Sequence, residues 1–204
     1  LIEEEHRNKV IELDDSIFMT FKTIHYVNKK FISEQMMFVT SPGYVWSIQE
    51  KKGDYFTHIR ERIKQNKGIV RKKNADYLLY LIVEAIIDNY YGAYEKLMEE
   101  VNLLKDLTKV KPSPTFAIDI ENNKQKLFIL KKAVSSLREA INRIDRIEIA
   151  NFEEGYFSEL KEQASFLIDD IDFDLQQLES SINLIFNMQS HRLNEVMKTL
   201  TILS

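Results

Sequence analysis

Hydrophobic residues in the last quarter of the chain repeat at intervals of three and four, from Tyr156 to Ser204. This stretch contains no Pro, and no Gly follows Gly155, so nothing in it has to end a helix. Intervals of three and four place side chains on one face of an α-helix. At about 1.5 Å per residue the helix would be roughly 70 Å long. We therefore expect a rod that leaves its own domain to meet other copies or partners. Its apolar positions are Leu160, Ala164, Leu167, Ile171, Leu175, Leu178, Ile182, Ile185, Leu193, Val196, Leu200 and Leu203.

A second stripe of mostly polar side chains follows another face of the same rod. Its members are also spaced by four and three: Asn183, Asn187, Ser190, Asn194, Met197 and Thr201. One interpretation is a partly buried polar seam that fixes helix register, as a buried Asn does in coiled coils. The other is the wall of a narrow pore, where like helices bring rings of weak dipoles around a hydrated ion. Periodicity alone favours the seam and leaves the pore open.

The first part of the chain has the alternation of β-strands. Three runs show it: Ile17–Val27, Phe31–Thr40 and Tyr44–Gln49. Turn residues separate them at Asn28–Lys30 and at Ser41-Pro42-Gly43. The pattern predicts an antiparallel meander, one edge of a sheet whose beginning is missing.

The period changes to that of helices after Asp54, which can cap a short helix with Phe56, Ile59 and Ile63 on its inner face. Long helices are predicted over 74–107 and 115–149, separated by the break at Lys111-Pro112-Ser113-Pro114. The predicted fold class is α+β: a partial β-sheet domain with flanking helices, followed by long antiparallel helices that form a funnel or stalk. The expected parts are 1–73, the end of an α/β domain; 74–151, two funnel helices; and 152–204, the stalk helix.

Composition narrows the function classes. The chain has 204 residues, 44% of them hydrophobic, and only five Gly and three Pro, which favours long uninterrupted elements. It has no cysteine, so disulfides and thiolate metal sites are excluded. A net charge of −4 does not suggest a nucleic-acid binder. We find no Gly-rich phosphate loop, no Ser-His or Cys-His arrangement and no cluster of His with acids, and predict that the protein is not an enzyme.

Acidic residues concentrate on the first half of the rod. Between Phe152 and Ile182 there are nine acids and one base, Lys161. Such a run is usually a solvated face. On a rod that bundles with copies of itself, however, the like charges have to be offset, and divalent cations with carboxylate ligands are a natural means.

Both ends of the chain look cut. It begins at Leu1 rather than Met, and the helical pattern is still running at Leu200–Ser204. No run of 18 apolar residues is present, so we expect no membrane span here. A rod that turns apolar as the sequence stops is what the mouth of a transmembrane segment would look like.

Several motifs, in order and at consistent spacing, resemble the CorA family of divalent-cation channels. Tyr44–Asp54 is similar to that family's strand and turn before the helical region, and Ile59–Ile63 and Gly68–Tyr80 continue in the same register. Asp88-Asn-Tyr-Tyr91 follows, and Asn194–Ile202 resembles the family's entry into its first transmembrane helix. The resemblance covers essentially the whole chain.

The resemblance implies the cytoplasmic part of a homopentameric Mg²⁺ channel, truncated at the start of the first transmembrane helix. The intact protein would be an integral membrane protein, with this part on the cytoplasmic side of the inner membrane and anchored by segments missing here. Its ions would be Mg²⁺ and, as a second candidate, Co²⁺; no nucleic-acid partner is implied. Asn194 would form a ring at the pore, with Met197 and Leu200 near a hydrophobic constriction, which makes the pore the leading interpretation of the polar stripe. The implied pore-lining residues are Asn183, Asn187, Ser190, Asn194, Met197 and Leu200.

The family also binds regulatory Mg²⁺ between the cytoplasmic domains of neighbouring subunits. By resemblance the ligands here are Glu159 on the terminal helix, Glu84 on the first long helix, and Asp88. The family commonly has Asp where this chain has Glu159, so the charge is kept on a longer arm. Asn183 replaces a ring of Asp and weakens the attraction for cations there. The implied mechanism is gating: at high Mg²⁺ the ions bridge acids and hold the funnel closed, and at low Mg²⁺ the acids repel and the helices splay.

Two other functions remain open. One is a Zn²⁺-transporting relative in the same superfamily, because the filter motif that would identify the ion lies outside this sequence. The other is a non-transporting module, a sheet domain with a helical stalk that only oligomerises. Metal-dependent uptake by the intact protein separates the first from Mg²⁺ transport, and mass measured with and without Mg²⁺ helps to separate the second.

Overall fold

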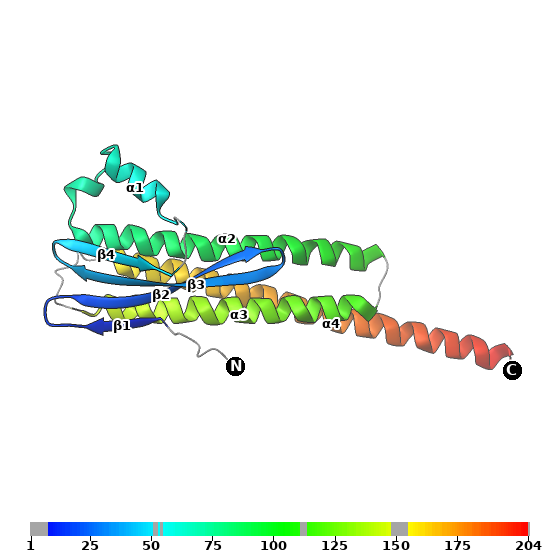
Figure 1. Cartoon of the computed structure of the whole chain (residues 1–204). Coiled ribbons are helices and arrows are strands. Elements are labelled where there is room, and N and C mark those ends of the chain that lie inside the picture. Colours follow the sequence, from blue (N-terminus) through cyan, green and yellow to red (C-terminus); the bar gives the residue numbers. More distant parts are fainter. Residues whose placement is uncertain (1–7, 51–52, 54, 111–113, 148–154, 204) are drawn as a thin grey trace.

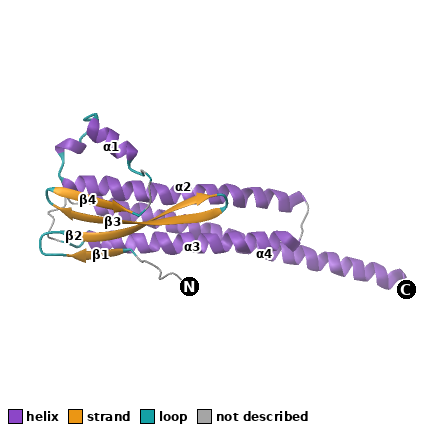
Figure 2. Ribbon diagram, viewed as in Figure 1, coloured by secondary structure: helices purple, strands orange, loops and turns teal. Residues whose placement is uncertain are grey.

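The computed structural model describes residues 8–50, 53, 55–110, 114–147 and 155–203, and for 105–110 and 114 the backbone alone. Within these ranges four strands precede a short helix, a 3₁₀ turn and three long helices (Figure 2). The elements are β1 (Lys9–Glu12), β2 (Ile17–Val27), β3 (Lys30–Ser41), β4 (Tyr44–Gln49), α1 (Thr57–Lys64), η1 (Val70–Lys72), α2 (Ala75–Val110), α3 (Pro114–Ile144) and α4 (Tyr156–Leu203).

The sheet is the predicted antiparallel meander, in the order β1-β2-β3-β4. The three predicted strands are confirmed. β1 is an additional strand that pairs with the first half of β2, from Lys9 opposite Thr20 to Glu12 opposite Ile17. The turn predicted at Asn28–Lys30 is a two-residue hairpin turn: Val27 pairs with Lys30, and Asn28 and Lys29 have φ values of 49° and 63°. Positive φ at both central residues gives the backbone twist that matches paired strands.

The helix boundaries agree with the predicted ones to within a few residues, with one larger difference. The helix predicted to continue to Ile149 ends at Ile144, because the chain tightens there into i→i+3 hydrogen bonds, such as Ile147 N to Ile144 O at 3.1 Å. The N-cap position of α1 is Phe56, which makes no side-chain capping bond. The predicted cap, Asp54, lies outside the described residues.

The sheet, α2 and α3, and α4 are stacked in that order (Figure 1). α2 and α4 run in the same direction and α3 runs against them. α2 contacts the sheet, its neighbour α3 and α4. This position explains why α2 is buried nearly all round through its first half, since a helix that is apolar on every face has to lie in a core. The buried residues there include Leu79, Leu81, Ile82, Val83, Ala85, Ile86, Ile87 and Tyr90.

A polar network fastens the sheet to the two middle helices. Lys126 of α3 places its Nζ 3.3 Å from Glu100 Oε1 on α2, and it donates to the Tyr26 hydroxyl of β2 at 2.8 Å and to Asn123 Oδ1 at 3.2 Å. Tyr26 in turn donates to Glu100. Burial, and then the neighbouring Glu100 carboxylate, raise the pKa of Tyr26, so its hydroxyl keeps its proton and remains a donor. The three elements are thus held by one mutually satisfied cluster.

α4 packs on α2 and α3 over its first part and then continues alone. The predicted apolar stripe is buried from Leu160 to Leu178, with Ile182 half-buried and Ile185 the last buried residue. Beyond it the helix projects past the end of α2 and the start of α3 (Figure 1), and every residue from Ser190 to Leu203 is exposed. None of the described helices combines the length and apolar character needed to cross a bilayer. The three-part division at 73 and 151 stays a prediction.

Candidate functional site: the projecting helix and the acidic seam

The polar stripe lies on the surface of α4. Asn183, Asn187, Ser190 and Asn194 are all exposed, and the next two members of the predicted pore lining, Met197 and Leu200, are 63% and 58% exposed. The stripe therefore does not pack against the part of its own chain that the structure describes. A surface line of short amides and hydroxyls can supply weak oxygen and nitrogen dipoles to whatever lies beside α4.

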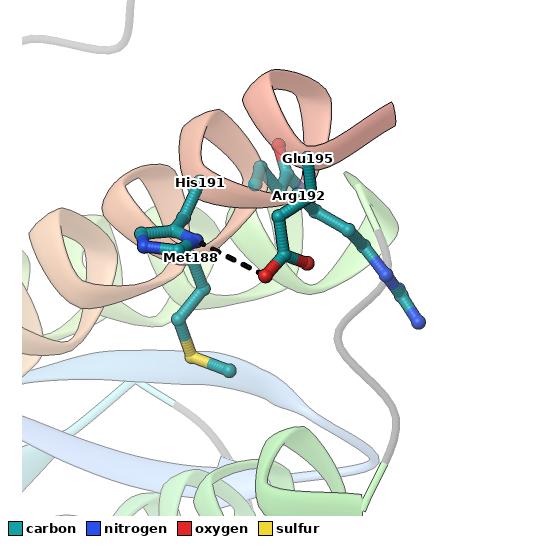
Figure 3. Close-up of a pocket in the computed structure, with 5 residues that line it drawn as sticks. Met188, His191, Arg192 and Glu195 are labelled. Atoms are coloured by element: carbon teal, nitrogen blue, oxygen red, sulfur yellow. Dashed lines mark ion pairs between the residues drawn. The ribbon is translucent and has the colours of Figure 1, made fainter. Parts of the chain in front are cut away.

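A shallow pocket follows the projecting part of α4, and Figure 3 shows the side chains that line it. They are Met188, Gln189, His191, Arg192 and Glu195. His191 Nδ1 lies 3.8 Å from Glu195 Oε1, one turn further along, and both side chains are largely exposed. Because its described lining comes from a single helix, this pocket is an open groove rather than an enclosed ligand site.

The predicted acids Glu84, on α2, and Glu159, on α4, both act on one tyrosine, Tyr80 of α2. Tyr80 donates from its hydroxyl to Glu84 Oε1 at 2.9 Å. Burial raises the pKa of Tyr80 most, the hydrogen bond and charge of Glu84 raise it next, and the charge of Glu159 adds to them. Both carboxylates therefore act on the same hydroxyl. Glu84 is half-buried and Glu159 is exposed, in the first turn of α4, where the helix dipole favours a negative charge.

Asp88 lies one turn beyond Glu84 and faces a different group of side chains. Its carboxyl is at the surface, yet burial by surrounding atoms raises its pKa, and the nearby His58 of α1 opposes this rise. Together with Asp170 of α4 it raises the pKa of Tyr91, after the larger effect of burial. Tyr91 donates to the backbone oxygen of Gln163 at 3.1 Å. Asp88 thus lies at the same contact between α2 and α4, about one helical turn further along than Glu84.

Two acids of the predicted acidic run are already engaged inside the chain. Asp172 accepts from Lys131 Nζ of α3 at 2.6 Å, and Asp174 accepts from the Tyr94 hydroxyl of α2 at 2.6 Å. Asp169 and Asp170 are exposed. Part of the like charge on α4 is therefore offset by neighbouring helices, and the remainder faces outward.

The tyrosines of this seam were not among the predicted site residues. Tyr77, Tyr80, Tyr91 and Tyr94 all lie on α2, and Tyr156 begins α4. The sequence did carry a signal, because Tyr80 precedes Glu84 by four positions, the spacing that brings side chains together on a helix.

The donors at this seam suit a hard divalent cation, since carboxylate oxygens are the ligands that Mg²⁺ and Ca²⁺ prefer. Among the residues that the structure describes, no group of three or more His, Asp or Glu side chains could hold a metal ion. Within one chain, Glu84 and Glu159 therefore offer at most part of a coordination shell.

The family model for CorA-like Mg²⁺ transporter proteins matches residues 1–204, the full chain. The chain belongs to this family. A cobalt/magnesium transport protein, CorA of Thermotoga maritima, is 29% identical over 209 residues, which cover 100% of this chain and 60% of that protein. The complete CorA magnesium transporter of Methanocaldococcus jannaschii superposes with a TM-score of 0.82 at 18% identity, covering 98% of this chain and 64% of that one. The soluble domain of the same transporter superposes with a TM-score of 0.74 at 18% identity, covering 88% of this chain and 73% of that domain.

Membership of the CorA-like family confirms the resemblance found in the sequence, and the superposition on a soluble CorA domain confirms the predicted fold class. The chain spans about 60% of the length of the curated relatives that it matches. Family membership does not by itself test the roles of Glu84, Asp88, Glu159 or the α4 stripe, which stay predictions.

Proposed function

We propose that this chain is the cytoplasmic, cation-sensing part of a homopentameric CorA-type magnesium transporter, on the inner face of the cell membrane. Mg²⁺ would be the transported and the regulatory ion, and Co²⁺ a second transported ion. In this proposal α4 leads toward the first membrane helix, in segments beyond this sequence. The single observation that carries it is the projecting part of α4, which keeps an apolar stripe and a polar stripe although none of the described residues of its own chain covers either one.

Copies of α4 around a common axis would use these two stripes differently. The line from Asn183 to Asn194 would face the axis and present amide and hydroxyl dipoles to a hydrated cation. Met197 and Leu200 would follow as an apolar constriction. Exposure of every one of these side chains in the single chain supports this arrangement, since a stripe already packed on its own domain could not line a shared pore.

Cation sensing would use the acids at the contact between α2 and α4. Glu84 and Glu159, with Asp88 one turn away, would provide carboxylates that a neighbouring subunit completes, which fits the lack of a three-ligand group among the described residues of one chain. A bridging cation would favour the closed assembly by the difference between its affinities for the closed and open states. Loss of the cation would leave exposed acids of adjacent subunits repelling each other. The all-carboxylate donor set favours Mg²⁺ over Zn²⁺ as the regulatory ion, because Zn²⁺ usually takes imidazole or thiolate ligands.

Cross-linking tests the pore arrangement, because this part of the protein has no cysteine of its own and any cysteine in the remaining segments can be replaced by serine. Asn194→Cys would place thiols near the axis, and Val196→Cys, about 200° around the helix, would place them away from it. In the intact membrane protein we expect rapid disulfide-linked dimers from the Asn194 variant and few from the Val196 variant. The reverse order would place the polar stripe on the outside of the assembly and refute the pore.

A Mg²⁺ titration tests the sensor. Mg²⁺ should raise the thermal unfolding midpoint and the protease resistance of the wild type, and Glu84→Ala combined with Glu159→Ala should blunt both effects. Glu179→Ala is the matched control, since it removes another exposed acid from α4 at a place outside the seam. An unchanged Mg²⁺ response in the double variant would rule out these two residues as the sensor. Repeating the titration with Co²⁺ and Zn²⁺ compares the ions directly.

A further inference from the structure

The contact between the beginnings of α2 and α4 is a cluster of three aromatic rings. Tyr80 lies 5.8 Å from Tyr77 and 5.1 Å from Tyr156, and Tyr77 lies 5.5 Å from Tyr156, all between ring centroids. These are distances at which aromatic pairs attract each other beyond simple burial. Tyr156 precedes Glu159 by three positions on α4, so a shift of this ring also moves the Glu159 backbone. The cluster therefore connects the two acids mechanically.

Tyr80 contacts one of the two acids directly. The residue is 8% exposed, and its hydroxyl donates to Glu84 Oε1. A carboxylate has about four acceptor positions, so this one bond leaves Oε2 and part of Oε1 for a cation. The bond also restricts the rotamers of Glu84, which is otherwise a long and flexible side chain.

The geometry points to Tyr80 as a positioning residue of the cation sensor, one that holds the Glu84 carboxylate toward Glu159 and couples an ion bound there to the α2–α4 contact. This inference rests on the proposed function, in which Glu84 and Glu159 bind a regulatory divalent cation. Groups that hold metal-ligating side chains from behind set the ligand geometry, and losing them commonly lowers metal affinity by about 10- to 100-fold. An ion that draws Glu84 and Glu159 together would shift the ring cluster, which lies about one turn before both acids on their helices, and would thereby change the packing of α4 on α2.

Tyr80→Phe tests the role, because it keeps the stacked ring and removes only the hydroxyl. The matched control is Tyr94→Phe, which removes the hydrogen bond of another α2 tyrosine to a carboxylate, that of Asp174 on α4 at 2.6 Å. Thermal unfolding of the full chain is followed over a series of Mg²⁺ concentrations. We expect the half-saturating Mg²⁺ concentration to rise about tenfold in Tyr80→Phe and to stay unchanged in Tyr94→Phe. Without Mg²⁺, both variants should lower the thermal unfolding midpoint, so the stability of the ion-free protein does not discriminate between them.

A second measurement reports on the phenol itself. Mg²⁺ should produce a tyrosine difference spectrum in the near ultraviolet in the wild type and in Tyr94→Phe, and this signal should be largely lost in Tyr80→Phe. A half-saturating concentration within about twofold of wild type, or an unchanged difference spectrum, would overturn the role of Tyr80 while the sensor remains. A wild type with no Mg²⁺ response at all would instead contradict the proposed function, and the inference with it.

Discussion

Truncating Leu175 and Leu193 to alanine separates the packed half of α4 from the projecting half. The two residues lie 18 positions apart, about five turns, and therefore point to the same side of the helix. Leu175 is 6% exposed and Leu193 is 66% exposed. Leucine and alanine are both strong helix formers, so the two substitutions differ mainly in what surrounds the side chain.

The expected costs follow from this burial. Leu175→Ala removes three buried carbon groups at about 0.8 kcal/mol each, and the cavity left behind brings the loss to about 3 kcal/mol. Leu193→Ala should change the free energy of unfolding of the isolated chain by less than about 0.5 kcal/mol. With a urea dependence of about 2 kcal/mol per molar, the first variant shifts the unfolding midpoint by about 1.5 M and the second hardly at all.

The assay is equilibrium urea unfolding followed by circular dichroism at several protein concentrations. A loss above about 1 kcal/mol for Leu193→Ala that is independent of concentration would mean that the end of α4 packs on its own chain, and the reasoning would fail. A loss that grows with concentration would instead report self-association through α4. Near-wild-type stability of Leu175→Ala would contradict the buried stripe itself.

Two further predictions concern the core of the sheet and its attachment to the helices. Lys126→Met should cost about 2–3 kcal/mol in chemical unfolding, because it removes the nearer cation from the mostly buried Glu100 carboxylate. Lys29→Met removes an exposed partner 3.9 Å from the same carboxylate and should cost less than about 0.5 kcal/mol. Equal losses in the two variants would contradict the network. Burial lowers the pKa of His25 below its ordinary 6.5, so the unfolded chain binds more protons, and stability should be complete above pH 6.5 and decline as the pH falls below it. His25→Phe keeps the stacking on Tyr55 and should flatten this decline in thermal unfolding measured against pH; an unchanged slope would assign the decline to other groups.

The long elements were predictable because nothing local competes with their periodicity. α4 begins at the predicted Tyr156, directly after Gly155, and continues without a breaker. β1 was missed because only one of its four residues, Val10, is even half-buried, so its sequence lacks the alternation that marks β2. The end of α3 was placed too late because Ile147 and Ile149 continue the apolar spacing beyond Ile144, although the helical hydrogen bonds stop there.

The candidate site was predictable only as a set of acids. Glu84 and Glu159 came from resemblance to a family, and no periodicity joins two residues so far apart in the chain. Tyr80 could not be singled out because Tyr serves both as a core residue and as a donor. Tyr90 on the same helix is fully buried and donates to the backbone oxygen of Lys22, and Tyr80 is buried and donates to Glu84. Ligands that a neighbouring copy would supply have no signature in a single sequence.

The projecting part of α4 constrains any function assigned to this protein. The stripe that is buried further up the helix continues at Leu193, Val196 and Leu203, yet each of these residues is more than half exposed. In an isolated domain, such side chains would cost solubility without contributing to stability. The apolar spacing thus continues beyond the last buried residue of the helix, which is explained if a second surface covers the exposed part. A polar stripe lies beside the apolar one on the same helix, so the covering surface has to leave the polar stripe in water. Symmetric copies of α4 around an aqueous axis would cover the apolar stripe and hydrate the polar one.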